Sequence, residues 1–308
     1  MKKVFIDGSA GTTGLRIRER LSCRDGLQLI TLPEALRKDP AARRDALNEA
    51  DVAFLCLPDA AAEEAVSLLE SDSTVLIDTS TAHRTSRGWV YGFPELWNRR
   101  DQIRSSLRIA NPGCHATGMI SLVAPLIASG AIRKDAVLSC FSLTGYSGGG
   151  KKMIAEYEAP DRSPLLDAPR QYGLTQSHKH LPEIKAQCEL ENEPVFCPIV
   201  APYYAGMEVT VPLSWADTYL TSGELLDIYE AYYRDEPLIH VRRDADEAGF
   251  LAANAFAGRD DLEIAVFGQE ERMILVSRFD NLGKGASGAA IQNMNLALGL
   301  PETEGLVI

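Results

Sequence analysis

The chain has 308 residues, 45% of them hydrophobic, and a formal net charge of −12. This length and composition predict a globular protein with two domains, each with its own core. Because nucleic acids and anionic membranes repel an acidic protein at long range, we expect neither as a partner.

The N-terminus and the cysteines indicate the cellular compartment. Residues 1–8 already have a strand-like pattern with no secretory signal, and no apolar run approaches the length of a membrane span. The six cysteines lack the spacing of a disulfide framework or a zinc ribbon. We therefore expect free thiols and a cytoplasmic protein.

A strand, a glycine-rich loop and a helix are predicted at the start of the chain, over Lys3–Asp7, Gly8–Gly14 and Leu15–Leu21. Gly8 permits a tight turn, and Gly11 lets a pyrophosphate approach the backbone at the helix N-terminus. The spacing departs from the usual G-x-G-x-x-G, and a glycine-rich turn that binds nothing is the alternative. The predicted dinucleotide-binding residues of this loop are Gly8, Ser9, Gly11, Thr12, Thr13 and Gly14.

A second strand, over Leu27–Leu32, leads to the segment expected to recognise the ribose. Arg37 and Lys38 lie in this segment, and two cations favour the 2′-phosphate of NADP over the plain ribose of NAD. Glu34 would suit a plain ribose equally well, so NAD is the alternative cofactor.

The following segments alternate between helix and strand. We expect helices over Pro40–Ala50 and Ala60–Leu69, and strands over Val52–Leu57, Thr74–Asp78 and Leu107–Asn111. This order predicts an α/β domain with a mostly parallel, doubly wound sheet of the Rossmann type.

Reactive side chains are predicted where these strands end, because ligands bind at the carboxyl ends of parallel strands. Arg84 suits a bidentate contact to phosphate, although a surface ion pair explains an arginine there equally well. The turn Asn111-Pro-Gly brings Cys114 to the start of a helix predicted over Cys114–Ala128. There the helix dipole and the unpaired N–H groups favour the thiolate, so Cys114 is the candidate nucleophile.

After this helix, longer strands and fewer helices predict a second, α+β domain. Strands are expected over Val137–Leu143, Gly206–Leu213, Leu262–Phe267 and Arg272–Phe279, and a helix starts at Ser222. A last apolar helix, ending near residue 298, is expected to pack back against the first domain.

The glycine-rich segment Gly145–Lys151 has the spacing of a nucleotide-binding P-loop. Lys152 replaces the Ser or Thr that would bind magnesium, so we expect no nucleotide hydrolysis. A mobile, basic loop that covers an anionic substrate fits this segment better.

His178, His180 and Glu183 form the second candidate cluster. A metal site needs a third and usually a fourth ligand, and no further cluster lies nearby in sequence, so no metal is predicted. One histidine that carries protons for Cys114, with Glu183 orienting it, is the sharper hypothesis. The other histidines, 83, 115 and 240, are interpreted as loop or partly buried polar residues.

These features together predict thiol-dependent hydride transfer. A Cys114 thiolate would attack an activated acyl carbon or an aldehyde, and a nicotinamide would exchange hydride with the same carbon. An acyl phosphate would explain the cations near the glycine-rich loops of this acidic protein, which are Arg84, Lys151, Lys152 and Lys179.

Five sequence blocks in the same order resemble N-acetyl-gamma-glutamyl-phosphate reductases, in particular the shorter of the two types in that family. The blocks cover residues 8–14, 111–118, 144–151, 178–183 and 280–288. The resemblance implies NADPH-dependent reduction of N-acetyl-L-glutamyl 5-phosphate to N-acetyl-L-glutamate 5-semialdehyde, with release of phosphate, in arginine biosynthesis. It also implies a homo-oligomer, either a dimer or a tetramer.

The resemblance also implies roles for individual residues and for the two domains. Residues 1–113 with 284–308 would bind NADP(H), and residues 114–283 would form the catalytic, substrate-binding and dimerisation domain. The implied catalytic residues are Cys114, His178, His180 and Glu183. The implied substrate-binding residues are Ser80, Arg84, Asn111, Ser147, Gly148 and Tyr172, and Asn281 and Lys284 would join the glycine loop, Arg37 and Lys38 at the cofactor.

Three alternatives are open at this point. Aspartate-semialdehyde dehydrogenase uses the same cysteine chemistry on a similar fold, and a reductase of a carrier-bound aminoadipyl phosphate is a close variant. A regulatory protein that binds NADP without turnover is the alternative from another class.

Overall fold

The computed structural model describes residues 1–269 and 271–308, which form two compact units. The first unit contains Met1–Gly113 and Ala286–Leu306, and the second contains Cys114–Gly285 and Val307–Ile308. In the described part of the chain, no helix is long and apolar enough to cross a membrane. The functions assigned above to two domains stay predictions.

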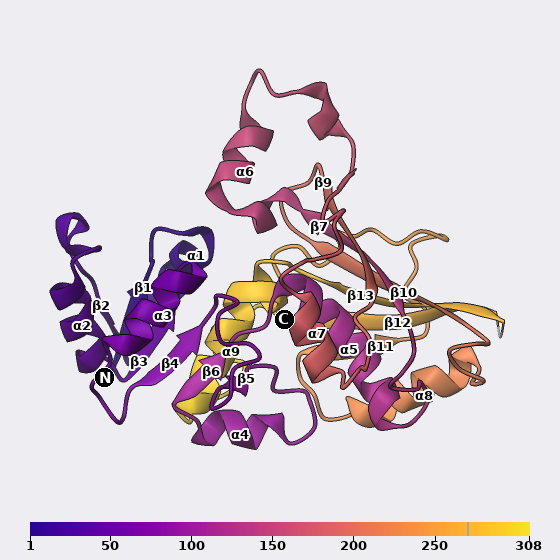
Figure 1. The fold of residues 1–308 in the computed structure, drawn as a ribbon, viewed down its shortest axis with the longest axis horizontal. Helices are drawn as coiled ribbons and strands as arrows, with labels where there is room; N and C mark the ends of the chain where they lie inside the picture. The colour runs from indigo at the N-terminus through magenta and orange to yellow at the C-terminus, as the bar shows by residue number, and fades with distance from the viewer. Residues whose placement is uncertain (270) are drawn as a thin grey trace. The chain divides into compact units, whose positions relative to one another are not determined.

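The first unit is built on a parallel sheet whose six strands, among the described residues, lie in the order β2-β1-β3-β4-β6-β5 (Figure 1). The strands are β1 (Lys2–Asp7), β2 (Leu27–Ile30), β3 (Val52–Leu55), β4 (Val75–Asp78), β5 (Val90–Tyr91) and β6 (Arg108–Ala110). The helices are α1 (Thr12–Leu21), η1 (Glu34–Leu36), α2 (Pro40–Glu49), α3 (Asp59–Ser67), α4 (Arg99–Ser105) and α9 (Gly288–Ala297).

Helices cover both faces of this sheet, and two separate cores result. On one face, strand residues such as Ile6 and Phe54 pack with Ile17 of α1, Ile103 of α4 and Ile291 of α9. On the other face the core contains Phe5, Leu55, Leu47 of α2, and Ala62 and Ala65 of α3. Buried strands with apolar side chains on both faces are typical of a parallel sheet. The predicted doubly wound fold and the packing of the last helix on this domain are confirmed.

Several element boundaries differ from the predicted ones. Helix α1 begins at Thr12 instead of Leu15, so the last part of the predicted loop is already helical. Strands β2 and β3 end earlier than expected, at Ile30 and Leu55. Helix α4 and strand β5 were not predicted, because both are short and lack a clear apolar period.

The second unit is built on a mixed sheet with seven strands among the described residues, in the order β11-β12-β13-β10-β7-β9-β8. They are β7 (Ser139–Gly145), β8 (Arg170–Gln171), β9 (Val195–Ala201), β10 (Met207–Ser214), β11 (Ile239–Arg242), β12 (Leu262–Gln269) and β13 (Arg272–Phe279). The helices include α5 (Cys114–Ala128), α6 (Gly150–Glu158), α7 (Leu181–Gln187) and α8 (Ser222–Tyr232), and a π-helical turn covers Gly283–Ser287.

Helix α5 packs against one face of this sheet and begins at the predicted residue. Every residue from His115 to Ile127 is buried, because the helix is apolar on all sides. At Gly118 a Cβ atom would lie 2.3 Å from Cγ2 of Val209 in β10, so only glycine allows the helix to approach the sheet this closely. The predicted α+β fold is confirmed.

The segment after β7 differs from the predicted mobile loop. A 3₁₀ turn covers Tyr146–Gly149, and α6 begins at Gly150, so Lys151 and Lys152 lie in the first turn of a helix. Figure 1 shows α6 and the chain that follows it as an arm standing away from the ends of β7 and β9. Tyr157 and Leu166 of this arm form a small core with Val200 of β9. The expected loop conformation beyond Gly149 is therefore wrong.

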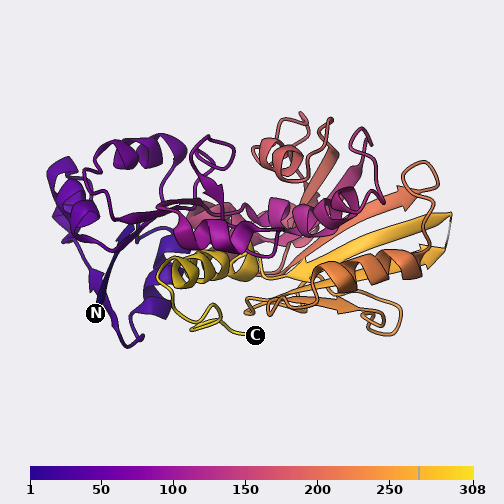
Figure 2. The same cartoon turned by 90° about the horizontal axis from the view of Figure 1, so that it is seen from below.

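Figure 2 gives a second view of the sheet of the second unit, with α8 (orange) lying along one side of it. The first residue of α8 follows a capping box, in which Thr221 and Glu224 bond each other's backbone N–H groups. Helix α7 and strands β8, β9 and β11 were not predicted. Strand β9 was missed because Pro198 interrupts its alternating pattern.

Candidate active site

The turn before the candidate nucleophile is held by four hydrogen bonds of Asn111 within the first unit. The Asn111 N–H donates to the carbonyl of Asp78 (2.7 Å), and its own carbonyl accepts from Nε of Arg84 (3.0 Å). The side chain donates from Nδ2 to the carbonyl of Ala286 (3.0 Å) and accepts from Nδ2 of Asn293 (3.1 Å). These bonds fix the end of β6, from which Pro112 and Gly113 lead directly to Cys114. A role of Asn111 in substrate binding stays a prediction.

Arg84 and Ser80 are ordered by bonds within the loop that follows β4. Arg84 is only 8% exposed, and its Nη2 donates to the carbonyl of Thr79 (3.1 Å) as well as bonding Asn111. The hydroxyl of Ser80 donates to Asp78 (2.8 Å), and the same carboxylate bonds Nδ1 of His83 (2.6 Å). Both residues therefore hold the loop together, and their predicted contacts with phosphate stay predictions.

Cys114 is the first residue of α5 and is half-buried, at the helix end where the dipole favours a thiolate. Gly285, in the π-helical turn, lies beside it, because a Cβ atom at Gly285 would come within 2.9 Å of Cβ of Cys114. Any larger residue at position 285 would displace the nucleophile.

Three histidines cluster in the second unit, and one of them was missed by the sequence interpretation. The ring centroids of His178 and His180 are 4.8 Å apart, and the ring of His115 lies 5.6 Å and 5.5 Å from them. Phe196 of β9 packs against His115 and His178, at 5.4 Å and 5.0 Å. The interpretation of His115 as a loop or partly buried residue is wrong. The signal in the sequence was a polar ring inside an otherwise apolar helix, because a buried histidine needs hydrogen-bond partners.

Both ring nitrogens of His115 are hydrogen-bonded, and the ring is buried. Nδ1 lies 2.6 Å from the hydroxyl of Ser142 in β7, and Nε2 lies 2.7 Å from the hydroxyl of Tyr172. Burial lowers the pKa of His115 to about 3, and the nearby charges of His178 and Lys179 act in the same direction. His115 is therefore neutral at pH 7, with one donor and one acceptor nitrogen.

His178 is less buried than His115 and is also neutral at pH 7. Burial, and secondarily the charge of Lys179, lowers the pKa of His178 to about 4. Nδ1 of His178 accepts a hydrogen bond from the backbone N–H of His180 (3.3 Å), so in the neutral ring the proton is on Nε2, which is a hydrogen-bond donor.

Glu183 lies beside His180, which is the N-cap residue of α7. Nε2 of His180 is 3.9 Å from Oε1 of Glu183, and both side chains are buried. No group of three or more His, Cys, Asp or Glu side chains in residues 1–269 and 271–308 is arranged to hold a metal ion. The ring of His115 could not join such a group, because both its nitrogens are already bonded.

Of the remaining predicted residues of the second unit, Ser147, Asn281 and Lys284 are buried and Gly148 is exposed. Nδ2 of Asn281 donates to the hydroxyl of Ser147 (3.0 Å), and its Oδ1 accepts from the N–H of Gly206 (2.9 Å). Gly148 lies against the same amide, since a Cβ atom there would be 3.4 Å from Nδ2. Lys284 is 1% exposed within the π-helical turn. Asn281 thus supports the 146–149 turn, and contacts of Asn281 and Lys284 with a cofactor stay predictions.

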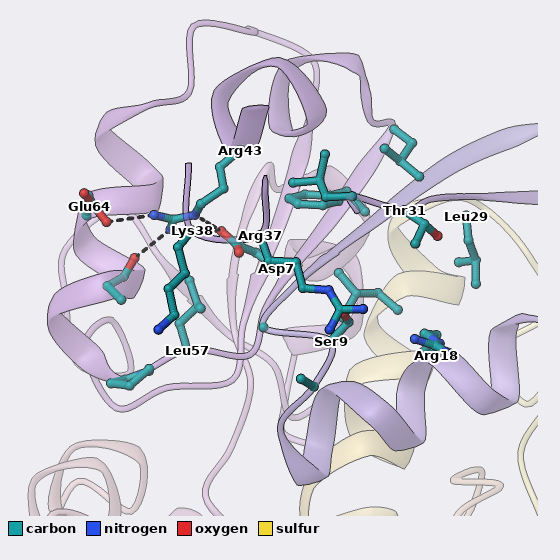
Figure 3. A pocket seen from close by; sticks show the side chains of 18 residues that line it. Asp7, Ser9, Arg18, Leu29, Thr31, Arg37, Lys38, Arg43, Leu57 and Glu64 are labelled. Atoms are coloured by element: carbon teal, nitrogen blue, oxygen red, sulfur yellow. Dashed lines mark hydrogen bonds and ion pairs between the residues drawn. The ribbon is translucent and has the colours of Figure 1, made fainter. Parts of the chain in front are cut away.

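A cavity of about 460 Å³ lies at the carboxyl ends of β1 and β2 in the first unit. It is lined by Gly8 and Ser9 of the predicted dinucleotide loop, and by Arg37 and Lys38 (Figure 3). Gly8 has φ +84°, and a Cβ atom there would lie 2.2 Å from the carbonyl oxygen of Cys56, so the turn requires glycine. The residues from Gly11 to Gly14 lie at the start of α1 and do not line this cavity.

The charges around this cavity are mostly positive. Arg18 of α1 also lines it and was missed, because it lies within the amphipathic helix and not in a loop (Figure 3). The two carboxylates of the lining, Asp7 and Glu64, are both bonded to Arg43, at 3.0 Å and 2.8 Å. Glu34, the residue considered for a plain ribose, does not line the cavity.

Comparisons with protein families match both units. The model described as the NAD binding domain of semialdehyde dehydrogenase matches residues 9–106, and the one described as the semialdehyde dehydrogenase dimerisation domain matches residues 114–281.

Solved structures share the fold of the chain. Aspartate semialdehyde dehydrogenase II from Vibrio cholerae, complexed with ASA, has a TM-score of 0.72 at 15% identity and covers 97% of this chain and 98% of its own. Aspartate semialdehyde dehydrogenase with NADP from Candida albicans has a TM-score of 0.67 at 17% identity, with 96% and 98% covered.

Curated relatives are much more similar in sequence. A Nostoc sp. protein named N-acetyl-gamma-glutamyl-phosphate reductase 2 is 43% identical, and the match covers 99% of both chains. N-acetyl-gamma-glutamyl-phosphate reductase of Burkholderia lata is 45% identical, with 96% of each chain covered. Identity at this level over nearly the whole length establishes that the chain belongs to the N-acetyl-gamma-glutamyl-phosphate reductase family, within the semialdehyde dehydrogenases.

Proposed function

We propose that the protein reduces N-acetyl-L-glutamyl 5-phosphate to N-acetyl-L-glutamate 5-semialdehyde, with release of phosphate and with NADPH as the hydride donor. The observation that carries the proposal is the placement of Cys114 at the start of α5, in the same unit as a cluster of three histidines, two of which, His115 and His178, are neutral at pH 7. The names of relatives at 43% and 45% identity support the choice of substrate.

The first step is attack of the Cys114 thiolate on the acyl carbon. The dipole of α5 favours both the thiolate and the oxyanion that develops on the acyl oxygen, because both are negative charges at the N-terminal end of the helix. When the carbonyl re-forms, the C–O bond to phosphate breaks and a thioester to Cys114 remains. The phosphate that leaves is negatively charged. Cations such as Arg84 favour this step because they stabilise that charge.

In the second step the thioester carbon becomes an aldehyde carbon. NADPH, when bound, supplies the hydride. Hydride addition leaves a negative charge on the oxygen of the tetrahedral intermediate, and Nε2–H of neutral His178 is the donor that we assign to this oxygen. The carbonyl group of the aldehyde forms as the C–S bond breaks. Cys114 leaves as the thiolate, ready for the next acyl phosphate.

The first unit has the features that NADP(H) requires. Oγ1 of Thr12, at the start of α1, is buried with no hydrogen-bond partner among the described residues, as expected for an atom that bonds a diphosphate. Arg18, Arg37 and Lys38 line the cavity beside Ser9, and Arg43 neutralises both nearby carboxylates. A cavity lined by cations, whose carboxylates are already bonded to an arginine, favours the 2′-phosphate of NADP over the 2′-hydroxyl of NAD.

We expect the double replacement Arg37→Ala with Lys38→Ala to raise the KM for NADPH by about tenfold or more, and to change the KM for NADH little. Both KM values should be measured with the same acyl substrate. Arg44→Ala is a matched control, because Arg44 is exposed on α2 and does not line the cavity. An equal loss for both cofactors would contradict the assignment of NADP.

The function itself is tested by following NADPH absorbance with N-acetyl-glutamyl phosphate and with aspartyl phosphate in parallel. We expect turnover with the first substrate and far less with the second. Preference for aspartyl phosphate would favour the aspartate-semialdehyde dehydrogenase alternative. NADPH binding without any turnover would favour a regulatory protein.

We also propose that the protein is a dimer, formed through the sheet face of the second unit that lies opposite α5. Alternate residues of β7, β9, β10, β12 and β13 form this open face. Its apolar part contains Phe141, Leu143, Val195, Cys197, Ile199, Pro212, Phe267 and Ile274, and the strand register places Glu208, Glu263 and Arg278 on the same face. Phe141 and Val195 are 42% and 47% exposed. Exposed apolar side chains gathered on a sheet are typical of a protein–protein contact, and the match to a dimerisation domain supports a second copy as the partner.

Phe141→Lys combined with Ile274→Lys should therefore shift the protein from dimer to monomer at micromolar concentration, because two buried cations per subunit are costly at an apolar contact. Sedimentation velocity measures the change. Tyr219→Lys is the control, since Tyr219 is 84% exposed but does not belong to the open face. A double variant that sediments like the wild type would exclude this face.

A further inference from the structure

The side chain of Asn293 in α9 is buried in the first unit and donates two hydrogen bonds. Asn293 is 0% exposed, and its Nδ2 donates to the carbonyl of Gly92 (2.9 Å) and to Oδ1 of Asn111 (3.1 Å). A carbonyl oxygen can only accept, so it is the nitrogen of the Asn293 amide that faces Gly92. Oδ1 of the same amide is buried with no hydrogen-bond partner among the described residues. Asn293 therefore joins the loop after β5 to the end of β6 through its NH2 group.

The amide of Asn293 determines how the amide of Asn111 is oriented. Nδ2 of Asn111 donates to the carbonyl of Ala286 (3.0 Å), so Oδ1 of Asn111 is the atom that accepts from Asn293. The N–H and carbonyl groups of Asn111 bond Asp78 and Arg84, but these two bonds fix only the backbone. Without Nδ2 at position 293, a buried oxygen of Asn111 loses its donor, and the Asn111 amide is no longer held in this orientation.

Two paths lead from Asn111 to the nucleophile. Along the chain, only a Pro-Gly pair separates Asn111 from Cys114. On the second path, the side chain of Asn111 holds the carbonyl of Ala286 in the π-helical turn. The residue before Ala286 is Gly285, where a Cβ atom would lie 2.9 Å from Cβ of Cys114. Both paths start at Asn111, so its position and orientation determine where the thiol lies.

We propose that Asn293 is a positioning residue for the nucleophile, which acts through Asn111 and not on the reacting atoms. Its amide holds Asn111 in the orientation that supports both the turn before Cys114 and the backbone beside it. The assignment rests on the proposed function and deepens it, because thioester formation and hydride transfer both require the sulfur at a fixed place. A displacement of about 1 Å costs roughly 10²-fold in rate.

Asn293→Ala should lower kcat by roughly 10- to 100-fold and change the KM for the acyl phosphate by less than about threefold, because a misplaced thiol slows the chemical step. In the apo-enzyme, the pH midpoint of Cys114 alkylation by iodoacetamide should rise by about half a unit. The reason is that a thiol displaced from the helix end loses part of the stabilisation by the dipole. Stopped-flow turnover and mass spectrometry of the alkylated peptide give the two readouts.

Asn295→Ala is the matched control, because Asn295 is another fully buried asparagine of α9. Its Nδ2 donates to the carbonyls of Glu302 and Glu304, both at 2.9 Å, and its Oδ1 accepts from Nη1 of Arg24 (2.8 Å). These partners belong to the C-terminal segment and to the chain after α1, not to the turn before the nucleophile. Both variants should lower Tm, but Asn295→Ala should keep the wild-type kcat and midpoint well below its Tm. Equal losses of kcat in the two variants would overturn the assignment.

The double replacement Asn111→Ala with Asn293→Ala tests whether Asn293 acts through Asn111. Its kcat should equal that of Asn111→Ala alone, because no amide remains for Asn293 to orient. Gly92→Ala disturbs the same contact from the other side, since its Cβ atom would lie 2.4 Å from Nδ2 of Asn293, and it should also lower kcat. This variant provides the test if Asn293→Ala does not fold. Losses that multiply in the double variant, or a wild-type kcat in Gly92→Ala, would contradict the proposal.

The alkylation assay needs neither substrate nor cofactor. If the acyl phosphate is not reduced but the midpoint rises in Asn293→Ala and not in Asn295→Ala, the proposed substrate is wrong and the role of Asn293 stands. If the substrate is reduced and Asn293→Ala changes neither kcat nor the midpoint, the role of Asn293 is wrong and the proposed function stands.

Discussion

Replacing Cys114 by serine should lower kcat by at least about 10³-fold, because a serine hydroxyl at neutral pH is almost never ionised and cannot form the thioester. NADPH affinity should remain close to that of the wild type, since the residues that line the proposed cofactor cavity lie in the other unit. Stopped-flow turnover with the acyl phosphate and fluorescence titration with NADPH give the two readouts.

Cys23→Ser is the control for this experiment, because Cys23 is the exposed thiol of the chain and should have no effect on turnover. Mass spectrometry of the wild-type enzyme with acyl phosphate but no NADPH should detect an acyl group on the peptide that contains Cys114. Near-normal activity of Cys114→Ser would exclude covalent catalysis by this residue.

His178→Asn should have the second largest effect and lower kcat by roughly 10²- to 10³-fold, the usual cost of removing one donor to a developing oxyanion. Asparagine keeps an acceptor near the backbone N–H of His180, but its shorter side chain has no donor in the place of Nε2–H. His180→Asn should cost less if His178 is this donor. A larger loss in His180→Asn than in His178→Asn would reverse the two roles.

The pH profile of kcat/KM provides an independent check of the same assignment. Protonation of His178 adds a hydrogen to Nδ1 and breaks its bond with the N–H of His180, and the pKa of about 4 keeps the ring neutral well below pH 6.5, the pKa of an ordinary histidine. The loss of activity due to its protonation should therefore lie near pH 4. Lys179→Gln removes one of the two causes of this low pKa and should move that limb to higher pH, though by less than the effect of burial.

The turn that leads from Asn111 to Cys114 could be predicted from the local sequence. The turn is fixed by the end of β6 and by the start of α5, both of which follow from patterns within a few residues of Cys114. The long-range bonds from Arg84 and Asn293 then hold the turn that these local patterns had already specified.

The sequence by itself determined the doubly wound first domain, the α+β second domain and the start of α5 at Cys114. These features depend on apolar periodicity, on glycines and on helix start signals, all of which act between residues close together in the chain. The candidate nucleophile and the glycine loop of the proposed cofactor site could be predicted from the sequence for the same reason.

Only the tertiary structure decided which polar residues surround the nucleophile. His115 bonds Ser142 and Tyr172, which are 27 and 57 residues away in sequence, and no local pattern specifies such pairs. Arg18 lines the proposed cofactor cavity only because the fold of the first unit brings it there. Phe141 and Ile274 lie on the same open face only because of the order and register of the strands. A lone histidine in an apolar helix carries no mark of its partners, because the donors that satisfy it come from strands and loops placed by the packing of the whole domain.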